Sequence, residues 1–425
     1  MSERDIVVLP AQATAGQEKR GIHSLWMQLR RELHSDAAKT ALGAWLALRI
    51  YCTLMGIAVY AIAPASFFST AIQQVFDRHI PSCPTYFSTA TGLNGALAGI
   101  WLRWDTAWYL EIAAHGYTCY GSTAFMPLYP ILIRVVGFPL GGDTLAAALL
   151  ISSIASLVVF YLLYQLAQAL TNSTATARAA AVAMALYPIS FFLMAGYTEA
   201  LFLALAIGSY LAARRGSWLA AGVLAALAAL TRLQGIVLLT PLGLELWLNH
   251  RNDLRRWQTW LSLALAPLAL ALYTLYIWSA QRIFPPWEPF NSVWRLHYAW
   301  PWQGIGQDIS ALFTHPDIGT LLSFRLFDPI TATLFLVCTV VAFRRLNFPL
   351  AAFMAIMWLS SVIKVTVPGE TTSISRYMLA LFPAFIVLGS VVTNWHRFVR
   401  LAAVLVSGLL LSVYLFIFLI WGWVA

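Results

Sequence analysis

Charged residues are scarce in this sequence. Asp, Glu, Lys and Arg together make up 10% of the 425 residues, whereas 60% are hydrophobic, and the mean hydropathy is +0.74. A soluble domain carries roughly a quarter charged residues on its surface, so this composition excludes one. It predicts an all-α polytopic membrane protein.

Several motif classes are also missing. The net charge is +9, yet no basic run follows a nucleic-acid-binding pattern, and the four cysteines have no metal-site spacing. Cys52 and Cys338 fall in apolar helices and are predicted to be packing residues. Cys83 and Cys119 both fall in the first large loop. If that loop lies outside the cytoplasm, they can form a disulfide, and the sequence does not decide the distance between them.

The first 40 residues are polar and basic, and the apolar stretch after them is too long for a signal-peptide core. We therefore expect residues 1–40 to form a cytoplasmic tail with a surface helix near 23–34. Residues 41–425 are expected to form a single transmembrane domain.

Since a span needs about 20 apolar residues, the apolar stretches predict the crossings. Two of them, 177–213 and 217–249, are too long for one span, and each is interrupted by a polar turn, at 196–199 and 231–235. Read as helical hairpins, they bring the total to about eleven spans. The single-span candidates are 41–65, 144–170, 258–279, 327–343, 348–366, 375–394 and 400–424.

The positive-inside rule sets the topology. With the N-terminus in the cytoplasm, most Lys and Arg residues fall in the N-terminal tail and on the cytoplasmic connections, provided that 124–140 does not cross. That short segment holds three prolines, and we expect it to be re-entrant or interfacial. The first loop (66–143), both polar turns, the loop 280–326 and the helix start at Arg376 then share the extracytoplasmic face.

Residues 101–117 carry the first candidate chemistry. Tryptophans recur there at helical spacing beside several ionisable groups, which predicts an amphipathic helix at the membrane surface. Asp105 is the candidate catalytic base, because a carboxylate between Trp104 and Trp108 is partly desolvated. The alternative is an interfacial acid paired with Arg103.

Glu199 and Tyr197, at one hairpin tip, are candidates to bind a sugar, because an acid in an apolar hairpin is usually functional. The alternative is a tip facing water. Arg232, Arg376 and Arg103 are candidates for a lipid phosphate, since a guanidinium bonds two oxygens at once. Each could instead be an anchor that reaches to the lipid head groups.

Three further residues, Gln234, His115 and Tyr117, are expected to contact the acceptor or the sugar. Asp105 and Glu111 could hold a divalent cation, but no Asp-x-Asp or ligand cluster accompanies them, so neither a metal nor another cofactor is expected. The aromatic loop 281–303 fits either a sugar-stacking surface or an aromatic belt on lipid head groups.

Five short motifs occur in an order that resembles the PIG-V family of mannosyltransferases. They are Arg-Trp-Asp-x-x-Trp-Tyr-x-x-Ile-Ala-x-x-Gly-Tyr at 103–117, Ala-Phe-Met-Pro-Leu-Tyr-Pro at 124–130, Tyr-Pro-x-Ser-Phe-Phe at 187–192, Tyr-Thr-Glu-Ala-Leu-Phe at 197–202 and Thr-Arg-Leu-Gln-Gly at 231–235. The resemblance covers roughly residues 40–250. Thr198 and Leu233-Gln234 depart from the family's Tyr-Ser-Glu and Thr-Arg-Ser-Asn-Gly turns, which puts the acceptor contacts in doubt.

The resemblance implies a GT-C fold and an inverting glycosyltransferase that uses a polyprenyl-phosphate sugar, with Asp105 as the base. The acceptor is expected to be a glycolipid, glycan or protein, and the location a bacterial inner membrane with an extracytoplasmic site. An accessory subunit is left open, because only the eukaryotic members of the family imply one. The rival prediction is a lipid or glycolipid transporter or flippase, although the sequence shows no internal repeat.

Overall fold

The structure is a computed structural model, and it describes residues 34–63, 91–314, 324–366 and 373–424. Almost all of its regular structure is helical, so the predicted all-α class is confirmed. The predicted surface helix at 23–34 and Cys83 lie outside the described residues.

Five helices in the described ranges are long and apolar enough to cross a membrane. They are α2 (Asp36–Ile62), α7 (Thr144–Thr171), α12 (Trp257–Gln281), α16 (Phe324–Arg345) and α20 (Arg397–Leu419). The number of about eleven spans stays a prediction, because the other apolar helices are shorter.

The two long apolar stretches do divide into helix pairs, as predicted. The pairs are α8 (Thr174–Ala185) with α9 (Glu199–Arg214), and α10 (Trp218–Thr231) with α11 (Leu239–Asn249). Polar turns with short 3-10 helices separate the partners, η4 (Ser190–Leu193) and η5 (Leu233–Leu238). Each turn therefore presents its polar groups between two apolar helices.

The remaining helices are shorter, and several belong to the two large loops. They are α4 (Gly92–Leu97), α5 (Asp105–His115), α6 (Leu128–Gly137), α13 (Pro289–Ser292), α14 (Pro301–Thr314), α17 (Phe348–Val362), α18 (Ile374–Leu379) and α19 (Phe382–Val392). The other 3-10 helices are η1 (Gly99–Trp101), η2 (Tyr120–Ala124), η3 (Phe138–Leu140) and η6 (Arg251–Arg255).

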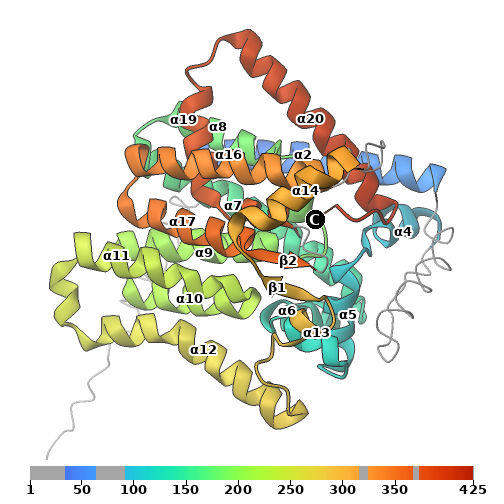
Figure 1. Cartoon of the computed structure of the whole chain (residues 1–425), viewed down its shortest axis with the longest axis horizontal. Coiled ribbons are helices and arrows are strands. Elements are labelled where there is room, and N and C mark those ends of the chain that lie inside the picture. Colours follow the sequence, from blue (N-terminus) through green and yellow to red (C-terminus); the bar gives the residue numbers. More distant parts are fainter. Residues whose placement is uncertain (1–33, 64–90, 315–323, 367–372, 425) are drawn as a thin grey trace, which may run out of the picture.

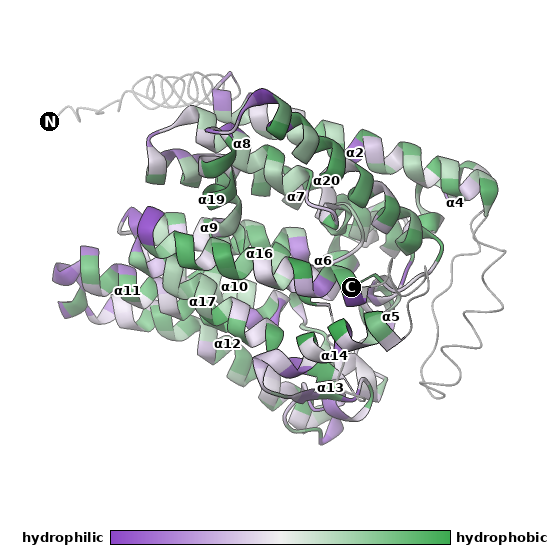
Figure 2. Cartoon of the chain, turned by 45° about the horizontal axis from the view of Figure 1, so that its top comes forward, coloured by the Kyte–Doolittle hydropathy of each residue, from purple (hydrophilic) through white to green (hydrophobic). Residues whose placement is uncertain are grey.

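Helix α2 turns several small residues inward and large apolar residues outward, as expected in lipid. On α2 the buried positions include Ala37, Ala41 and Ala44, whereas Leu46 and Leu54 are exposed. In Figure 2, hydrophobic colour runs along most helices and hydrophilic colour gathers at the ends and connections, as at the far end of α11.

Loop elements gather at one end of the molecule, opposite α11 (Figure 1). They include α5, α6, α13 and a two-stranded antiparallel sheet of β1 (Leu296–Tyr298) and β2 (Lys364–Thr366), in which His297 is opposite Val365. The ten residues of α6 are too few to cross a membrane, which agrees with the interfacial placement predicted for 124–140.

Candidate functional site

Asp105 is the first residue of α5, and the chain enters this helix through a strained turn. Trp104 has a φ of 48°, in the left-handed region that non-glycine residues rarely adopt. The hydroxyl of Tyr197 fixes the turn, because it accepts from the backbone N–H of Asp105 and donates to the carbonyl of Arg103, both at 3.2 Å. An acid at a helix N-terminus is also favoured by the helix dipole.

Glu199 occupies the same position on another helix, since it is the first residue of α9. Its side chain is buried, and Oε1 accepts from Nη1 of Arg232 and, at 2.5 Å, from Nε of Arg376. Its other oxygen, Oε2, is buried without a hydrogen-bond partner in the described part of the chain. One buried carboxylate oxygen thus keeps its capacity to accept a hydrogen bond.

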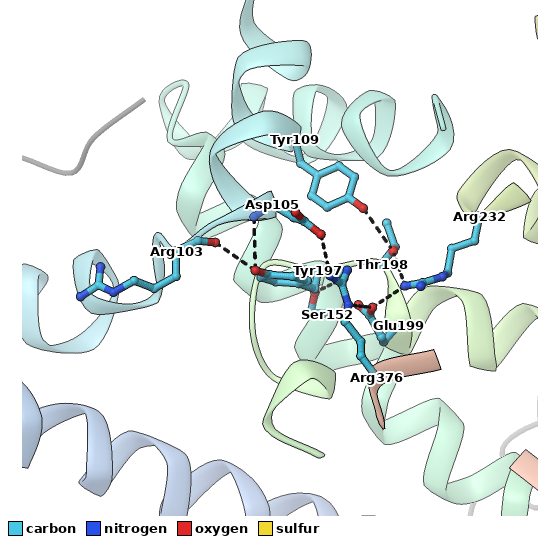
Figure 3. A network of polar contacts seen from close by, with 9 residues as sticks. All are labelled: Arg103, Asp105, Tyr109, Ser152, Tyr197, Thr198, Glu199, Arg232 and Arg376. Atoms are coloured by element: carbon cyan, nitrogen blue, oxygen red, sulfur yellow. Dashed lines mark hydrogen bonds and ion pairs between the residues drawn. The ribbon is translucent and has the colours of Figure 1, made fainter. Parts of the chain in front are cut away.

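Arg376 joins the two acids (Figure 3). Its Nη1 lies 2.6 Å from Oδ2 of Asp105, whose side chain is 20% exposed, while Nε binds Glu199. The guanidinium carbon lies 5.0 Å from the ring centroid of Phe192 and 4.6 Å from that of Tyr197. Ion pairs and aromatic faces together compensate the cost of burying this charge.

The short helix that carries Arg376 is held by two buried side chains. The carboxylate of Asp328, at the start of α16, accepts from the backbone N–H groups of Ile374 and Ser375, each at 2.9 Å. The hydroxyl of Tyr187 donates to the carbonyl of Ser375 at 2.8 Å. These contacts fix the first turn of α18 and hence the direction of Arg376.

Arg232 approaches Glu199 from the end of α10, and its Nη1 also donates to Oγ1 of Thr198 at 3.2 Å. The turn is tight at Gly235, because a Cβ there would lie 2.4 Å from the backbone N of Ala229. Only glycine allows this approach of the turn to α10.

Three more residues, Tyr109, Lys364 and Tyr377, border this network. The hydroxyl of Tyr109 lies 3.3 Å from Oγ1 of Thr198. Burial raises the pKa of Tyr109, and the Asp105 carboxylate raises it further, so the phenol keeps its proton at neutral pH. On the other side, Nζ of Lys364 lies 5.2 Å and the guanidinium carbon of Arg232 lies 5.8 Å from the ring centroid of Tyr377.

The structure does not bring Arg103 into this network, which corrects its prediction as a phosphate ligand. Its guanidinium points away (Figure 3) and donates to the carbonyls of Leu419 (2.9 Å), Leu102 (3.0 Å) and Gly99 (3.4 Å). Burial lowers its pKa to about 9. Arg103 therefore ties the loop to the end of α20, and it does not pair with Asp105 as the alternative prediction held.

The helix predicted over 101–117 also needs correction. It begins only at Asp105, because the left-handed turn at Trp104 precedes it, and most of its side chains are buried in the protein rather than on a surface. Trp101 lies in η1, so the three tryptophans do not share one helical face. Sugar binding by Tyr197 stays a prediction, and in the structure its hydroxyl binds the backbone.

The other predicted contacts lie elsewhere. Nδ1 of His115 lies 2.8 Å from Oε1 of Glu111, and the hydroxyl of Tyr117 donates to the carbonyl of Phe125 at 2.8 Å. Gln234 is half-buried in η5, and no hydrogen bond between described residues joins it to the acids. The described residues contain no group of three or more His, Cys, Asp or Glu side chains placed to hold a metal.

The aromatic loop divides into two parts. Trp294 packs inside, with its ring centroid 5.7 Å from that of Trp108 and 5.8 Å from that of Phe125. Trp300 and Trp302 stack on each other at 5.3 Å and are exposed. This outer pair, together with the exposed Phe284 and Tyr298, is free to meet a sugar or lipid head groups.

Sequence reasoning missed Asp328, Lys364 and Tyr377. Asp328 carried a usable signal, since an acid inside an apolar stretch is expensive unless it has a partner. Lys364 and Tyr377 gave none, because only the fold brings β2 beside α18. Of the cysteines, Cys119 is disulfide-bonded, whereas Cys52 and Cys338 are buried and free.

Comparison with known proteins gives a family and several distant likenesses. A family model described as mannosyltransferase (PIG-V) matches residues 45–265. GPI alpha-1,6-mannosyltransferase 2 from Rattus norvegicus is 35% identical over 151 residues, which are 33% of this chain and 31% of that protein. GPI mannosyltransferase 2 from Drosophila pseudoobscura pseudoobscura is 33% identical over 111 residues, 24% of each chain. The match thus spans a third or less of these two relatives.

Among solved structures, ArnT from Cupriavidus metallidurans bound to undecaprenyl phosphate has a TM-score of 0.47 and 16% identity, over 80% of this chain and 62% of that one. The archaeal oligosaccharyltransferase AglB from Archaeoglobus fulgidus, in complex with an inhibitory peptide and a dolichol-phosphate, has a TM-score of 0.44 and 14% identity, over 90% of this chain and 56% of that one.

Proposed function

Because this chain belongs to the PIG-V mannosyltransferase family, we propose that it transfers mannose from a polyprenyl-phosphate donor to a hydroxyl group. The acceptor is a glycolipid, glycan or protein, and transfer takes place on the extracytoplasmic face of a bacterial inner membrane. The arginine-rich connections between the predicted spans support this orientation.

One observation carries the proposal. Arg376 binds Asp105 and Glu199 together, so that the acids of two family motifs and a basic residue from outside the matched region form one buried cluster. Buried ion pairs cost desolvation energy and are weak evidence for stability alone. A buried ion-pair cluster in which one carboxylate, that of Asp105, is partly exposed is typical of a functional site.

Asp105 is proposed as the base. Its carboxylate takes the proton of the acceptor hydroxyl while the hydroxyl oxygen attacks the anomeric carbon of the donor. The bond from that carbon to the phosphate oxygen breaks, and the electron pair leaves with the polyprenyl phosphate. Attack from the side opposite the phosphate inverts the configuration of the sugar.

The cations are proposed to receive the leaving phosphate. Two guanidinium groups balance the two carboxylates of the network, and Lys364 adds one further positive charge near the ring of Tyr377, which Arg232 also approaches. Fixed cations aimed at a developing negative charge are the strongest general device of catalysis. When the phosphate binds, it competes for Arg376, and this competition would release Asp105 to act as a base.

Sugar hydroxyls are assigned to two of the buried oxygens that have no partner in the described ranges, Oε2 of Glu199 and Oγ1 of Thr106. Thr106 follows the proposed base directly, and Glu199 shares Arg376 with it. A ligand that donates hydrogen bonds to both oxygens would satisfy them at once.

The test measures mannose transfer from radiolabelled polyprenyl-phosphate mannose by the purified protein in nanodiscs with membrane extracts. Asp105→Asn should lower the rate by about a hundredfold or more. Asp36→Asn is the matched control, because Asp36 also opens a helix and pairs with an arginine, Arg178, but on an exposed surface. Transfer by folded Asp105→Asn protein at the control rate would refute the base, and lipid movement without transfer would favour a flippase.

A further inference from the structure

A second polar pocket lies far from the Asp105 network. A cavity of about 480 Å³ is bordered by the ends of α7, α9, α11 and α16 and by the start of α17. Its polar lining consists of Arg214, Glu245, Asn249, His250, Arg345 and Asn347. Glu199 and Arg214 are the two ends of α9, so at about 1.5 Å per residue the pocket and the network are more than about 20 Å apart.

Glu245, the acid in this pocket, already accepts a hydrogen bond at each of its two carboxylate oxygens. Oε2 of the buried Glu245 accepts from the hydroxyl of Tyr210 at 2.8 Å, and Oε1 accepts from Nδ2 of Asn249 at 3.0 Å. The Tyr210 hydroxyl in turn accepts from Nδ2 of Asn347 at 2.5 Å. This chain of hydrogen bonds fixes the pocket wall across α9, α11 and α17 without using either arginine.

Two buried polar atoms of the pocket wall lack a hydrogen-bond partner among the described residues. These atoms are Nη1 of Arg214 and Oδ1 of Asn347. Arg345 donates only to Oγ and the carbonyl oxygen of Ser390, at 3.2 and 3.5 Å, within the same ranges. Neither Arg214 nor Arg345 forms an ion pair with another described residue. Buried polar atoms normally have partners, so an unmatched donor and acceptor in one cavity indicate a ligand.

The ligand must carry an anion and a hydrogen-bond donor. Two guanidinium groups from different helices match a phosphate, which accepts from both forks, and Oδ1 of Asn347 requires an N–H or O–H group. The cavity volume lies in the range of small-molecule sites. The chain next to the lining residues adds positive charge, since Arg215 follows α9, Arg344 lies in the last turn of α16 and Arg251 follows His250.

Exposed aromatic side chains occur on the helices that border the pocket. Trp247, Phe343 and Phe348 are exposed, and each is within three residues of a lining residue. Large exposed aromatic groups at a polar helix end suit the interface between lipid tails and head groups. An acyl chain lying along these helices would cover such side chains, whereas a soluble phosphate compound would leave them exposed.

We propose that this pocket binds the head group of a phospholipid whose phosphate lies between Arg214 and Arg345 and whose amine or hydroxyl group donates to Asn347. Phosphatidylethanolamine and phosphatidylglycerol have this chemistry. The bound lipid connects α9 to α16 and α17 at the end of the molecule opposite the Asp105 network. This site does not depend on the proposed transfer reaction.

The test is the thermal unfolding of the delipidated full chain in detergent, titrated with short-chain lipids, because a ligand that binds the folded state raises the unfolding midpoint. Short-chain phosphatidylethanolamine and phosphatidylglycerol should raise it. Diacylglycerol of the same length, which lacks the phosphate, should not. Phosphatidylcholine keeps the phosphate but has no donor, and it should bind several-fold more weakly.

Arg214→Gln should weaken phosphatidylglycerol binding tenfold or more, whereas Arg215→Gln, at the exposed neighbouring residue, should not change it. If Arg214→Gln does not fold, Arg345→Gln provides the same comparison. Equal binding by Arg214→Gln and Arg215→Gln would overturn the site. Equal stabilisation by inorganic phosphate alone would overturn the lipid and leave a soluble phosphate ligand.

Discussion

Nη1 of Arg376 lies 2.6 Å from Oδ2 of Asp105, although 271 positions of sequence separate the two residues. The contact joins a loop helix of the first half of the chain to a short helix near its C-terminal end. It also makes Arg376 a partner of both acids, because Nε binds Glu199.

The first prediction concerns that double contact. Arg376→Lys keeps the positive charge, but an ammonium group cannot reproduce the planar fork that binds both acids. We expect at least a hundredfold loss of mannose transfer, measured with purified protein. Arg400→Lys, at an exposed residue of α20, is the control. Near-normal transfer by Arg376→Lys would show that the fork is dispensable.

The second prediction concerns coupling between Glu199 and Arg376. Removing one partner of a buried pair leaves an uncompensated charge and costs about 3–5 kcal/mol. Each of Glu199→Gln and Arg376→Gln should therefore lower the free energy of unfolding, and the double variant should lose less than the sum. Denaturant unfolding of all four proteins gives the coupling energy. Strict additivity would mean that the pair is not coupled in solution.

A third prediction treats Asp328 as a positioning residue. Its carboxylate caps the first turn of α18 through two N–H groups, and an amide at the same place offers only one acceptor oxygen. Asp328→Asn should lower kcat about fivefold with little change in KM for the donor, because the cost of a lost cap is about 1 kcal/mol. Asp328→Glu should restore part of kcat. A rise in KM alone would assign Asp328 to donor binding instead.

The fourth prediction concerns Lys364. If its ammonium group holds the donor phosphate before and during transfer, Lys364→Gln should raise KM for the donor with a smaller effect on kcat. The effect should be largest at low salt, since ions screen the attraction. Lys39→Gln, at an exposed residue of α2, serves as the control. An unchanged KM would remove Lys364 from the donor site.

The sequence identified what depends on local pattern. Scarce charge and long apolar stretches predicted a helical membrane protein, and the polar interruptions at 196–199 and 231–235 predicted helix pairs with functional turns. The motif around Asp105 indicated the family, because motifs keep their residue types and spacing. Arg232 and Glu199 were singled out because ionisable groups are costly beside apolar helices.

The sequence did not predict which way the charged side chains point or which groups they bind. Arg103 and Arg376 looked alike as basic residues beside motifs, yet one binds backbone carbonyls near the end of α20 and the other binds two carboxylates. A left-handed residue at Trp104 shortened the predicted helix, and no spacing rule indicates such a turn. Asp328 was overlooked because its partners lie 46 and 47 positions away.

The sequence by itself determined the membrane class, the family motifs and the residue types available for chemistry, because hydropathy and motif spacing are properties of adjacent residues. Only the tertiary structure decided which arginine meets which acid, which oxygens stay without partners and which residues hold Arg376 in place. Those contacts arise from helices that pack across hundreds of positions, where burial removes water and each charge must find its partner within a few ångströms.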